Sequence, residues 1–396
     1  MVTLPLLQPL RASRMVGVAA MVAIGSACAS QTVTVVQANL ARDLTYRTEC
    51  GALTIEPAVV SEDLRYVAFA RDFDCRPMGL EVGDLVNDRR VAVFDRNGTP
   101  CHSRDTSGDV RFVGRELIWL CAPGSAFDPA QPFVSIYRWS APFTAPPERQ
   151  DVWLPFDDTH LVTVASFAVS PDGGQIVVGL IANQPPITRA GTGHVYAIDR
   201  QGQLTDHTDE AVPDDSASNW LPALDGLFWT QSGITVFGGE GPSRQLIATR
   251  MDPATFEPVE SWRLPYAPGR SSAHLSLSSN DMVGVFAGEG AREQPFFDVY
   301  DLARRQIIRR FPSEDMGLRR RHGWGEVSPD DQMATWLDQR TCQIEVHRGE
   351  QFDSRHTMEF PDRDRDRECG GQVRALTGQR VLINNNVTIA VRSVDD

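Results

Sequence analysis

The sequence contains no lysine, and all 38 of its basic residues are arginine. Reactions that need a lysine amine are therefore excluded: Schiff-base chemistry, attachment of pyridoxal phosphate, a phosphate-loop lysine and a Ser-Lys dyad. We interpret this absence as a compositional bias toward arginine. No Cys-x-x-Cys motif occurs either, so zinc and thioredoxin-type redox sites lack their usual signature.

Net positive charge is also absent, since the formal charge is −14 and the sequence pI is about 5.1. Binding to a phosphate backbone needs a basic face, so nucleic acid is excluded as an expected partner. After the first thirty residues, no apolar run approaches the length of a membrane span. The 396 residues, 41% of them hydrophobic, are enough for one large all-β domain or for two ordinary domains.

Residues 1–29 have the pattern of an export signal. Two arginines precede an apolar core at residues 15–24, and small residues follow. Cleavage after Ala29 would leave a mature domain of residues 30–396. We therefore expect the protein in the periplasm or cell envelope of a bacterium.

The alternative for this segment is a lipoprotein signal in which Cys28 is acylated. Ser26, Ala27 and Cys28 resemble the bacterial lipobox, although Gly25 stands where that motif has a larger aliphatic residue. The only membrane contact that we expect is a lipid anchor on Cys28. Both processing routes remain open at this point.

Six further cysteines form an even set, which in an exported chain indicates disulfides. Six cysteines allow 15 pairings, and we expect each to pair with its nearest neighbour in sequence. The six are Cys50, Cys75, Cys101, Cys121, Cys342 and Cys369.

A repeated unit organises the rest of the chain, and its clearest copy spans residues 167–204. A short apolar strand meets a tight turn at residues 170–174, and an apolar run and a second, alternating strand at residues 194–199 follow. Proline presets the first corner of such a turn, Asp bonds the backbone ahead of it, and glycine accepts positive φ. Six weaker copies recur roughly every 45 to 60 residues. The sequence predicts an all-β fold, a single seven-bladed β-propeller.

The seventh copy has only three strands before the sequence stops, whereas a propeller blade has four. Residues 31–37 or residues 44–47 could supply the missing outer strand, which would close the ring and remove an exposed sheet edge. A Pro-rich insertion between residues 139 and 164 contains Trp153. We interpret it as a surface loop, an outer strand, or both.

Two of the turns carry a resemblance to a known family. Ser170-Pro171-Asp172-Gly173 and Ser328-Pro329-Asp330-Asp331, each followed by an apolar strand, resemble the TolB-type, WD-like propeller repeats of bacterial envelope proteins. The resemblance implies a propeller fold. The binding residues of that family have no counterpart here, so none is carried over.

Catalytic and metal motifs are weak in this sequence. Asp362, Asp364 and Asp366 have the spacing of a calcium loop, but Arg367 stands where that loop needs glycine, so we favour a solvated loop. The eight histidines are scattered, and no Gly-x-Ser-x-Gly motif occurs. Propeller lyases resembling the oligogalacturonate-cleaving class use a histidine cluster at the central channel, and no equivalent is evident. No cofactor or metal is predicted.

Candidate binding residues are arginines and tryptophans in connections. Arginines 304, 305, 309, 310 and 319–321 fall in one blade and the connection after it, where they could bind a carboxylate or phosphate or simply face solvent. Trp119, Trp229 and Trp336 end apolar strands and are predicted core residues, whereas Trp153, Trp220 and Trp324 are predicted to line a recognition surface. The candidates that we select are Arg319, Arg320, Arg321, Trp324 and Trp153.

These observations favour a non-catalytic binding or scaffolding module of the cell envelope, with an envelope protein or a glycan as its partner. The alternative is a carbohydrate-active lyase or hydrolase whose acidic residues and histidines gather at the mouth of the channel. Three histidines near the ring axis would favour the enzyme, and a channel lined only by apolar and Arg side chains would count against it.

Overall fold

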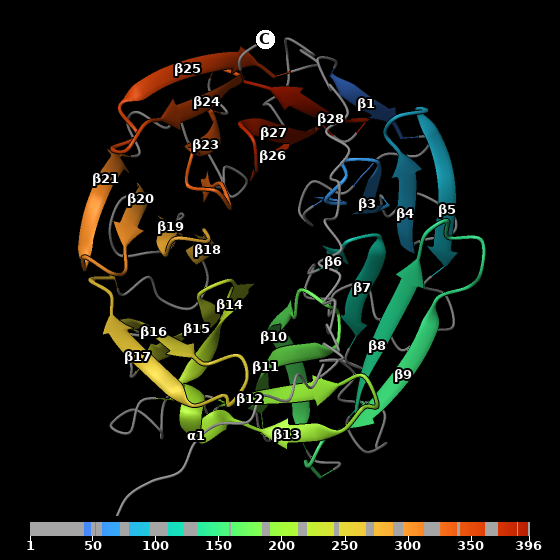
Figure 1. Cartoon of the computed structure of the whole chain (residues 1–396), viewed down its shortest axis with the longest axis vertical. Coiled ribbons are helices and arrows are strands. Elements are labelled where there is room, and N and C mark those ends of the chain that lie inside the picture. Colours follow the sequence, from blue (N-terminus) through green and yellow to red (C-terminus); the bar gives the residue numbers. More distant parts are fainter. Residues whose placement is uncertain are drawn as a thin grey trace, which may run out of the picture. The chain divides into compact units, whose positions relative to one another are not determined.

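The computed structural model describes most of the chain from residue 43 onward, as an all-β ring of seven four-stranded antiparallel sheets (Figure 1). The described residues are 43–48, 52, 58–71, 79–95, 110–121, 133–157, 160–183, 191–212, 220–240, 245–266, 273–287, 296–312, 325–338, 341–360, 371–385 and 387–394. The seven sheets lie within the compact unit formed by residues 39–396. The predicted seven-bladed β-propeller is confirmed.

Six blades are built from four consecutive strands each, ordered from the centre of the ring outward (Figure 1). The first contains β2 (Val59–Val60), β3 (Tyr66–Ala70), β4 (Gly79–Asp84) and β5 (Arg89–Asp95). The second contains β6 (Val110–Val113), β7 (Glu116–Cys121), β8 (Phe133–Ser140) and β9 (Glu148–Trp153). The third contains β10 (Leu161–Val169), β11 (Gln175–Asn183), β12 (Thr192–Asp199) and β13 (Leu204–Asp206), and the short helix α1 (Thr208–Ala211) follows it.

The next three blades repeat this order. The fourth contains β14 (Leu221–Thr230), β15 (Gly233–Glu240), β16 (Gln245–Met251) and β17 (Pro258–Arg263). The fifth contains β18 (Ala273–Leu277), β19 (Met282–Ala287), β20 (Phe296–Asp301) and β21 (Gln306–Pro312). The sixth contains β22 (Glu326–Val327), β23 (Met333–Asp338), β24 (Gln343–Arg348) and β25 (Ser354–Glu359).

The seventh blade joins the two ends of the ring. It contains β26 (Gln372–Leu376), β27 (Arg380–Asn384) and β28 (Thr388–Ser393), and β1 (Leu44–Arg47) pairs with β28 as its outer strand. Of the two predicted closing segments, residues 44–47 are therefore the one used, while residues 31–37 lie outside the described residues. Tyr46 is buried, and its hydroxyl donates to Glu81 of the first blade.

The hydrophobic core lies between blades. Each of seven buried clusters combines side chains from two neighbouring sheets; Phe167 of the third blade, for example, packs with Ile118 and Val134 of the second. Both faces of the second strand of a blade are therefore covered, as in β3 and β23. This explains why these second strands are apolar runs in the sequence. Trp119 and Trp336 are core residues, as predicted.

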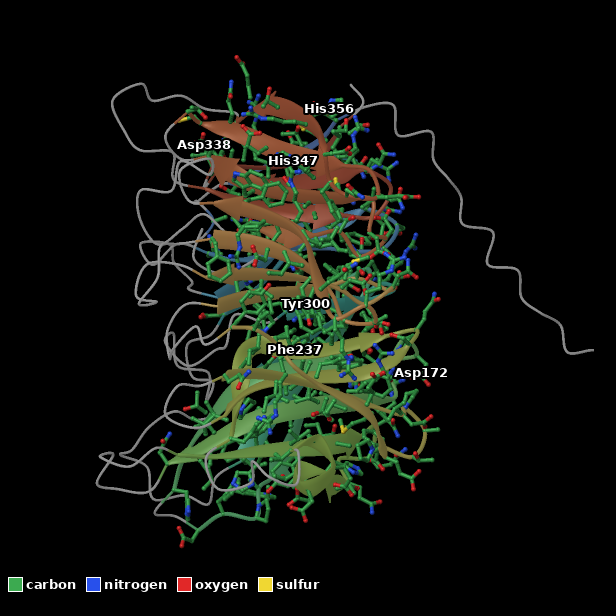
Figure 2. The ribbon with its side chains drawn as sticks, turned by 90° about the vertical axis from the view of Figure 1, so that its left-hand side faces the viewer. Asp172, Phe237, Tyr300, Asp338, His347 and His356 are labelled. Atoms are coloured by element: carbon green, nitrogen blue, oxygen red, sulfur yellow. The ribbon has the colours of Figure 1, made fainter. Side chains whose placement is uncertain are left out.

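The repeated turn motif is explained by its serine. Ser170 Oγ accepts a hydrogen bond from the backbone N–H of Gln175 at 2.8 Å, and Asp172 accepts from the N–H of Gly174 at 2.9 Å. Ser328 makes the same bond to the N–H of Met333 at 3.1 Å. These turns join the first and second strands of a blade, and we call their side of the ring the turn face. Figure 2 shows Asp172 on this side and Asp338, at the end of β23, on the other.

Two expectations about the surface have opposite outcomes. The insertion around Trp153 forms the outer strand β9, and the Trp153 side chain is 55% exposed beside Phe133. The expectation that Trp220 lines a recognition surface is wrong: it is only 3% exposed, because its ring packs flat over the backbone of Gly238. Within the described part of the chain, no helix is long and apolar enough to cross a membrane.

Candidate functional site

A cavity of about 630 Å³ lies where the inner strands of all seven blades meet. Its walls come from β2, β6, β10, β14, β18, β22 and β26 or from residues beside them. It reaches the turn face, because residues of the turns also line it: Glu62, Pro171, Gln231, Ser279 and Pro329. We call this cavity the channel. The channel brings together residues from the first blade and from the last blade, which are far apart in the sequence.

Most of the channel wall is apolar. Phe112, Val169, Phe228 and Trp229 are half-buried and line it from three neighbouring blades. Trp229 was predicted as a core residue; it packs partly against a buried cluster and partly lines the channel. An apolar concave wall with a few placed polar groups is the usual character of a small-molecule site.

The polar part of the wall includes an ionic cluster of Glu326, Arg374 and His274. Glu326 Oε1 accepts from Arg374 Nε at 3.1 Å and lies 3.1 Å from His274 Nε2. Glu326 Oε2 accepts from the backbone N–H of Ala375 at 3.2 Å. The three side chains come from β22, β26 and β18, so the cluster links three consecutive blades.

Burial and charge act in opposite directions on Glu326. Its side chain is only 4% exposed, and burial alone would raise its pKa. The Arg374 guanidinium, His274 and the N–H of Ala375 more than offset this effect and hold the pKa of Glu326 below its usual value. The carboxylate is therefore ionised and fixed at neutral pH.

Arg374 also contacts the first blade. Its Nη1 donates to the carbonyl of Ala58 at 3.5 Å, and the N–H of Ala58 donates to Gln372 at 3.4 Å. The Arg374 side chain is 25% exposed. Its Nε and Nη1 thus bond to the wall, whereas no described residue accepts a hydrogen bond from Nη2.

Two further charged residues line the channel. Arg111 of β6 is half-buried, and its guanidinium carbon lies 5.7 Å from the centre of the Phe167 ring. Glu62 is exposed in the turn after β2. His274 is the one histidine among the described residues that line the channel. No group of three His, Cys, Asp or Glu side chains within the described ranges is placed to hold a metal ion.

The candidates selected from the sequence are only partly placed by the structure. Arg319, Arg320, Arg321 and Trp324 lie outside the described residues, as do the three aspartates from Asp362 to Asp366. Trp153 lies on an outer strand, away from the channel.

The arginines of the fifth blade are described, and most of them have carboxylate partners. Arg310 pairs with the buried Asp298 at 2.7 Å, and Arg305 pairs with Glu260 at 3.2 Å. Arg304 pairs with Asp301 at 3.4 Å. Paired surface arginines of this kind fit the interpretation that they face solvent.

The cysteine and lipidation candidates fall mostly outside the described residues. Cys121 is buried at the end of β7, and Cys342 precedes β24. Cys28, Cys50, Cys75, Cys101 and Cys369 are not among the described residues. Disulfide pairing and acylation therefore stay predictions.

Sequence reasoning missed the ionic cluster. Glu326 and Arg374 fall in predicted strands, but nothing marked them as partners across 48 residues. The available signal was the occurrence of charged residues in inner strands that are otherwise apolar.

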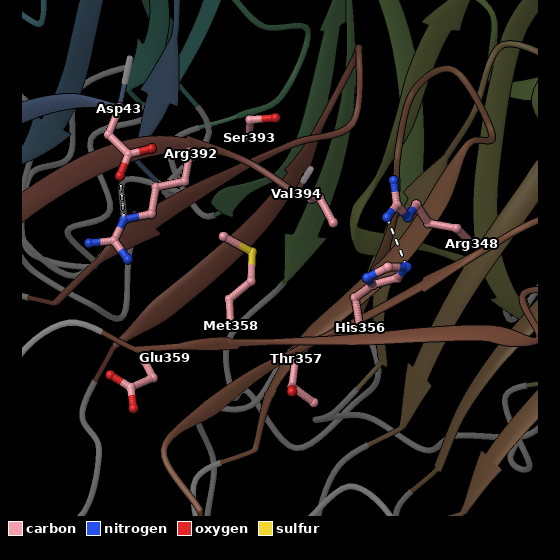
Figure 3. A pocket seen from close by; sticks show the side chains of 9 residues that line it. All are labelled: Asp43, Arg348, His356, Thr357, Met358, Glu359, Arg392, Ser393 and Val394. Atoms are coloured by element: carbon pink, nitrogen blue, oxygen red, sulfur yellow. Dashed lines mark hydrogen bonds and ion pairs between the residues drawn. The ribbon is translucent and has the colours of Figure 1, made fainter. Parts of the chain in front are cut away.

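A second cavity, of about 520 Å³, lies between the sixth and seventh blades (Figure 3). An ion pair between Asp43 and Arg392, 3.2 Å apart, lies toward one end of the view, and Arg348 with His356, 2.8 Å apart, lies toward the other. Met358 is drawn between them. In the channel, by contrast, most of the wall is apolar and no described residue accepts from Nη2 of Arg374, so the channel is the stronger candidate for a ligand site.

The comparisons with known proteins identify a fold. No protein-family model matches the sequence, and no curated protein sequence matches it. A structure described as oligogalacturonate lyase in complex with manganese has a TM-score of 0.51 at 11% identity, covering 89% of this chain and 90% of that one. The Dos1 propeller has a TM-score of 0.48 at 10% identity, with 89% and 95% covered. A structure from a study of two prolyl endopeptidases has a TM-score of 0.46 at 12% identity, with 86% and 46% covered.

At 11% identity, the likeness to the oligogalacturonate lyase structure concerns the fold alone. The solved neighbours include enzymes, so the fold does not choose between binding and catalysis. The resemblance to TolB-type repeats stays a prediction.

Proposed function

We propose that this protein is an exported, non-catalytic binding propeller of the bacterial cell envelope, and that it holds its ligand in the channel. The observation that carries the proposal is the channel wall. Seven inner strands enclose about 630 Å³ with apolar side chains and one fixed ionic cluster, which is the composition of a small-molecule site.

The proposed site is the channel, and not the connection that contains Trp324, which was the expectation from the sequence. In this account the ionic cluster fixes the orientation of a ligand, and the apolar wall supplies most of the affinity. Val169, Phe228 and Trp229 are half-buried there, so a ligand can cover their remaining exposed surface. The envelope protein or glycan expected from the sequence stays a prediction about further partners.

The test fills the channel and asks whether the ligand disappears. Val169 lines the channel, and Val169→Trp would place a large ring in that space. The matched control is Val259→Trp, since Val259 is 63% exposed on an outer strand. Each protein is purified from its own envelope without added ligand, and small molecules released by denaturation are identified by mass spectrometry.

We expect one compound, at close to one molecule per chain, from the wild-type protein and from Val259→Trp, and none from Val169→Trp. Circular dichroism is used to check that both variants are folded. Equal release from the two variants would overturn the channel as the binding site. Release of nothing from the wild-type protein, together with no response in a metabolite screen by thermal shift, would overturn the binding proposal.

A second candidate, a carbohydrate-active lyase or hydrolase, is favoured by one observation. His274 lies 3.1 Å from a buried carboxylate in the channel wall, and a carboxylate that orients a histidine is an arrangement used in general base catalysis. Oligosaccharides that contain uronic acids would be incubated with wild-type protein and with His274→Ala. Cleavage that depends on His274 would establish the enzyme and overturn the non-catalytic proposal.

A further inference from the structure

Arg374 is held in the channel wall through two of its three guanidinium nitrogens. Nε donates to Glu326 at 3.1 Å, and Nη1 donates to the carbonyl of Ala58 at 3.5 Å. These contacts come from the sixth and first blades, on either side of the blade that carries Arg374. The arginine is therefore fixed from both sides.

The carboxylate that holds Arg374 in the wall, that of Glu326, is buried. Removing Glu326 from water is costly, and such an ion is retained only when its partners satisfy it. His274 and the N–H of Ala375 bond to the same carboxylate as Arg374 does. These two additional contacts fix the position of Glu326, and Glu326 in turn fixes the position of Arg374. A planar guanidinium that is fixed in advance loses little side-chain freedom when it binds a ligand.

The charge that remains accessible in this part of the channel is positive. The carboxylate of Glu326 is almost fully buried and engaged, whereas the Arg374 side chain is 25% exposed. Its Nη2 carries two N–H donors, and no described residue accepts from them. Arg111 is a second cation in the wall, and Glu62 is an exposed carboxylate near the turn face.

We infer that the channel selects a ligand with a carboxylate group and an apolar body. This inference rests on the proposed function and names the class of its ligand. The carboxylate accepts hydrogen bonds from Nη2 of Arg374, and the apolar body lies against Phe228 and Trp229. A guanidinium and a carboxylate form short, directional bonds of this kind, whereas a neutral hydroxyl gains less from the same donors.

The experiment compares probes that differ only in this group. Calorimetric titrations use 4-phenylbutyrate, the alcohol 4-phenylbutanol and the amine 4-phenylbutylamine on the full mature chain. We expect the carboxylate to bind the wild-type protein about tenfold more tightly than the alcohol, and we expect the amine to bind most weakly. This comparison needs no variant, so it stays decisive if a substitution at Arg374 prevents folding.

Variants then assign the preference to Arg374. Arg374→Met should reduce the ratio of carboxylate to alcohol affinity to near one, and Arg374→Lys should retain part of it, because lysine keeps the charge but loses the planar fork. Arg89→Met is the matched control, since Arg89 is 67% exposed on β5, and its ratio should equal that of the wild-type protein.

The inference is overturned if the alcohol or the amine binds the wild-type protein as tightly as the carboxylate does, or if none of the three probes binds. It is also overturned if Arg374→Met keeps the wild-type ratio of carboxylate to alcohol affinity. None of these results requires the channel-filling experiment to fail. A compound released by the wild-type protein but not by Val169→Trp would still establish binding in the channel, with a ligand of another class.

Discussion

Arg374 of β26 donates to Glu326 of β22 over 3.1 Å, across the boundary between the sixth and seventh blades. The seventh blade is the one that β1 completes from the other end of the described chain. The ionic cluster therefore lies beside the closure of the ring, and it contributes both to that closure and to the wall of the channel.

Glu326→Gln should destabilise the fold strongly. The substitution removes the buried negative charge that compensates Arg374, and breaking one partner of a buried pair costs about 3–5 kcal/mol. Urea unfolding measures the free energy of unfolding. Glu260→Gln is the control, because Glu260 and Arg305 form an exposed pair for which we expect a loss of about 1 kcal/mol or less. Equal losses in the free energy of unfolding for the two variants would contradict a stabilising role for the buried Glu326.

Tyr46→Ala should weaken the closure of the ring. The Tyr46 ring is buried between the seventh and first blades, and its hydroxyl donates to Glu81. Deleting a buried aromatic side chain costs about 3–5 kcal/mol, while Tyr46→Phe, which removes only the hydroxyl, should cost about 1–2 kcal/mol. Thermal and urea unfolding report both losses.

The control for the closing strand is Val387→Ala, because Val387 is 53% exposed just before β28 and should change stability by about 0.5 kcal/mol or less. If Tyr46→Ala were as mild as this control, β1 would not be packed on the ring in solution.

His347 should make the protein less stable in mild acid. It is buried against Trp336 and Phe311, and its Nδ1 donates to the carbonyl of Phe352. Burial lowers the pKa of His347 below 6.5, so the unfolded chain takes up a proton at a higher pH than the folded chain does. This contribution to stability is intact above about pH 6.5 and is lost as the pH falls from there toward the folded pKa.

His347→Gln removes this titration, and the free energy of unfolding should then fall less between pH 7.5 and pH 5 than it does in the wild-type protein. Identical slopes in the wild-type protein and in His347→Gln would contradict a buried, neutral His347.

Processing of the predicted export signal can be measured by using the absence of lysine. An amine-reactive ester has only the N-terminal amine to modify, so peptide mapping of the labelled, envelope-purified protein identifies the first residue. Cleavage after Ala29 predicts a label on Ser30. An N-terminal peptide that starts at Cys28 and carries the mass of a lipid would establish the anchor instead, and a label on Met1 would contradict export by either route.

The fold was largely predictable because the propeller repeats a local pattern. The strand at residues 116–121 and the serine turns at residues 170 and 328 follow from apolar runs and turn chemistry that involve only near neighbours. Outer strands were harder to recognise. Strand β25 is exposed along nearly its whole length and β17 along most of it, so neither shows the alternation that identifies a half-buried strand.

The site was not predictable, because it depends on how the ring closes. Glu326 meets Arg374 only when blades six and seven pack together, and Arg374 reaches Ala58 only when the last blade meets the first. Sequence spacing says nothing of which inner-strand side chains face the axis. The predicted recognition residues were therefore tryptophans and arginines in connections, and one of these, Trp220, is buried.

The most direct test is an experimental structure of the protein purified from its own envelope with no ligand added. We expect density for a small molecule in the channel, with a carboxylate within hydrogen-bond distance of Nη2 of Arg374 and an apolar part against Trp229. A channel that contains only ordered water, while a ligand or partner occupies another surface of the ring, would contradict it.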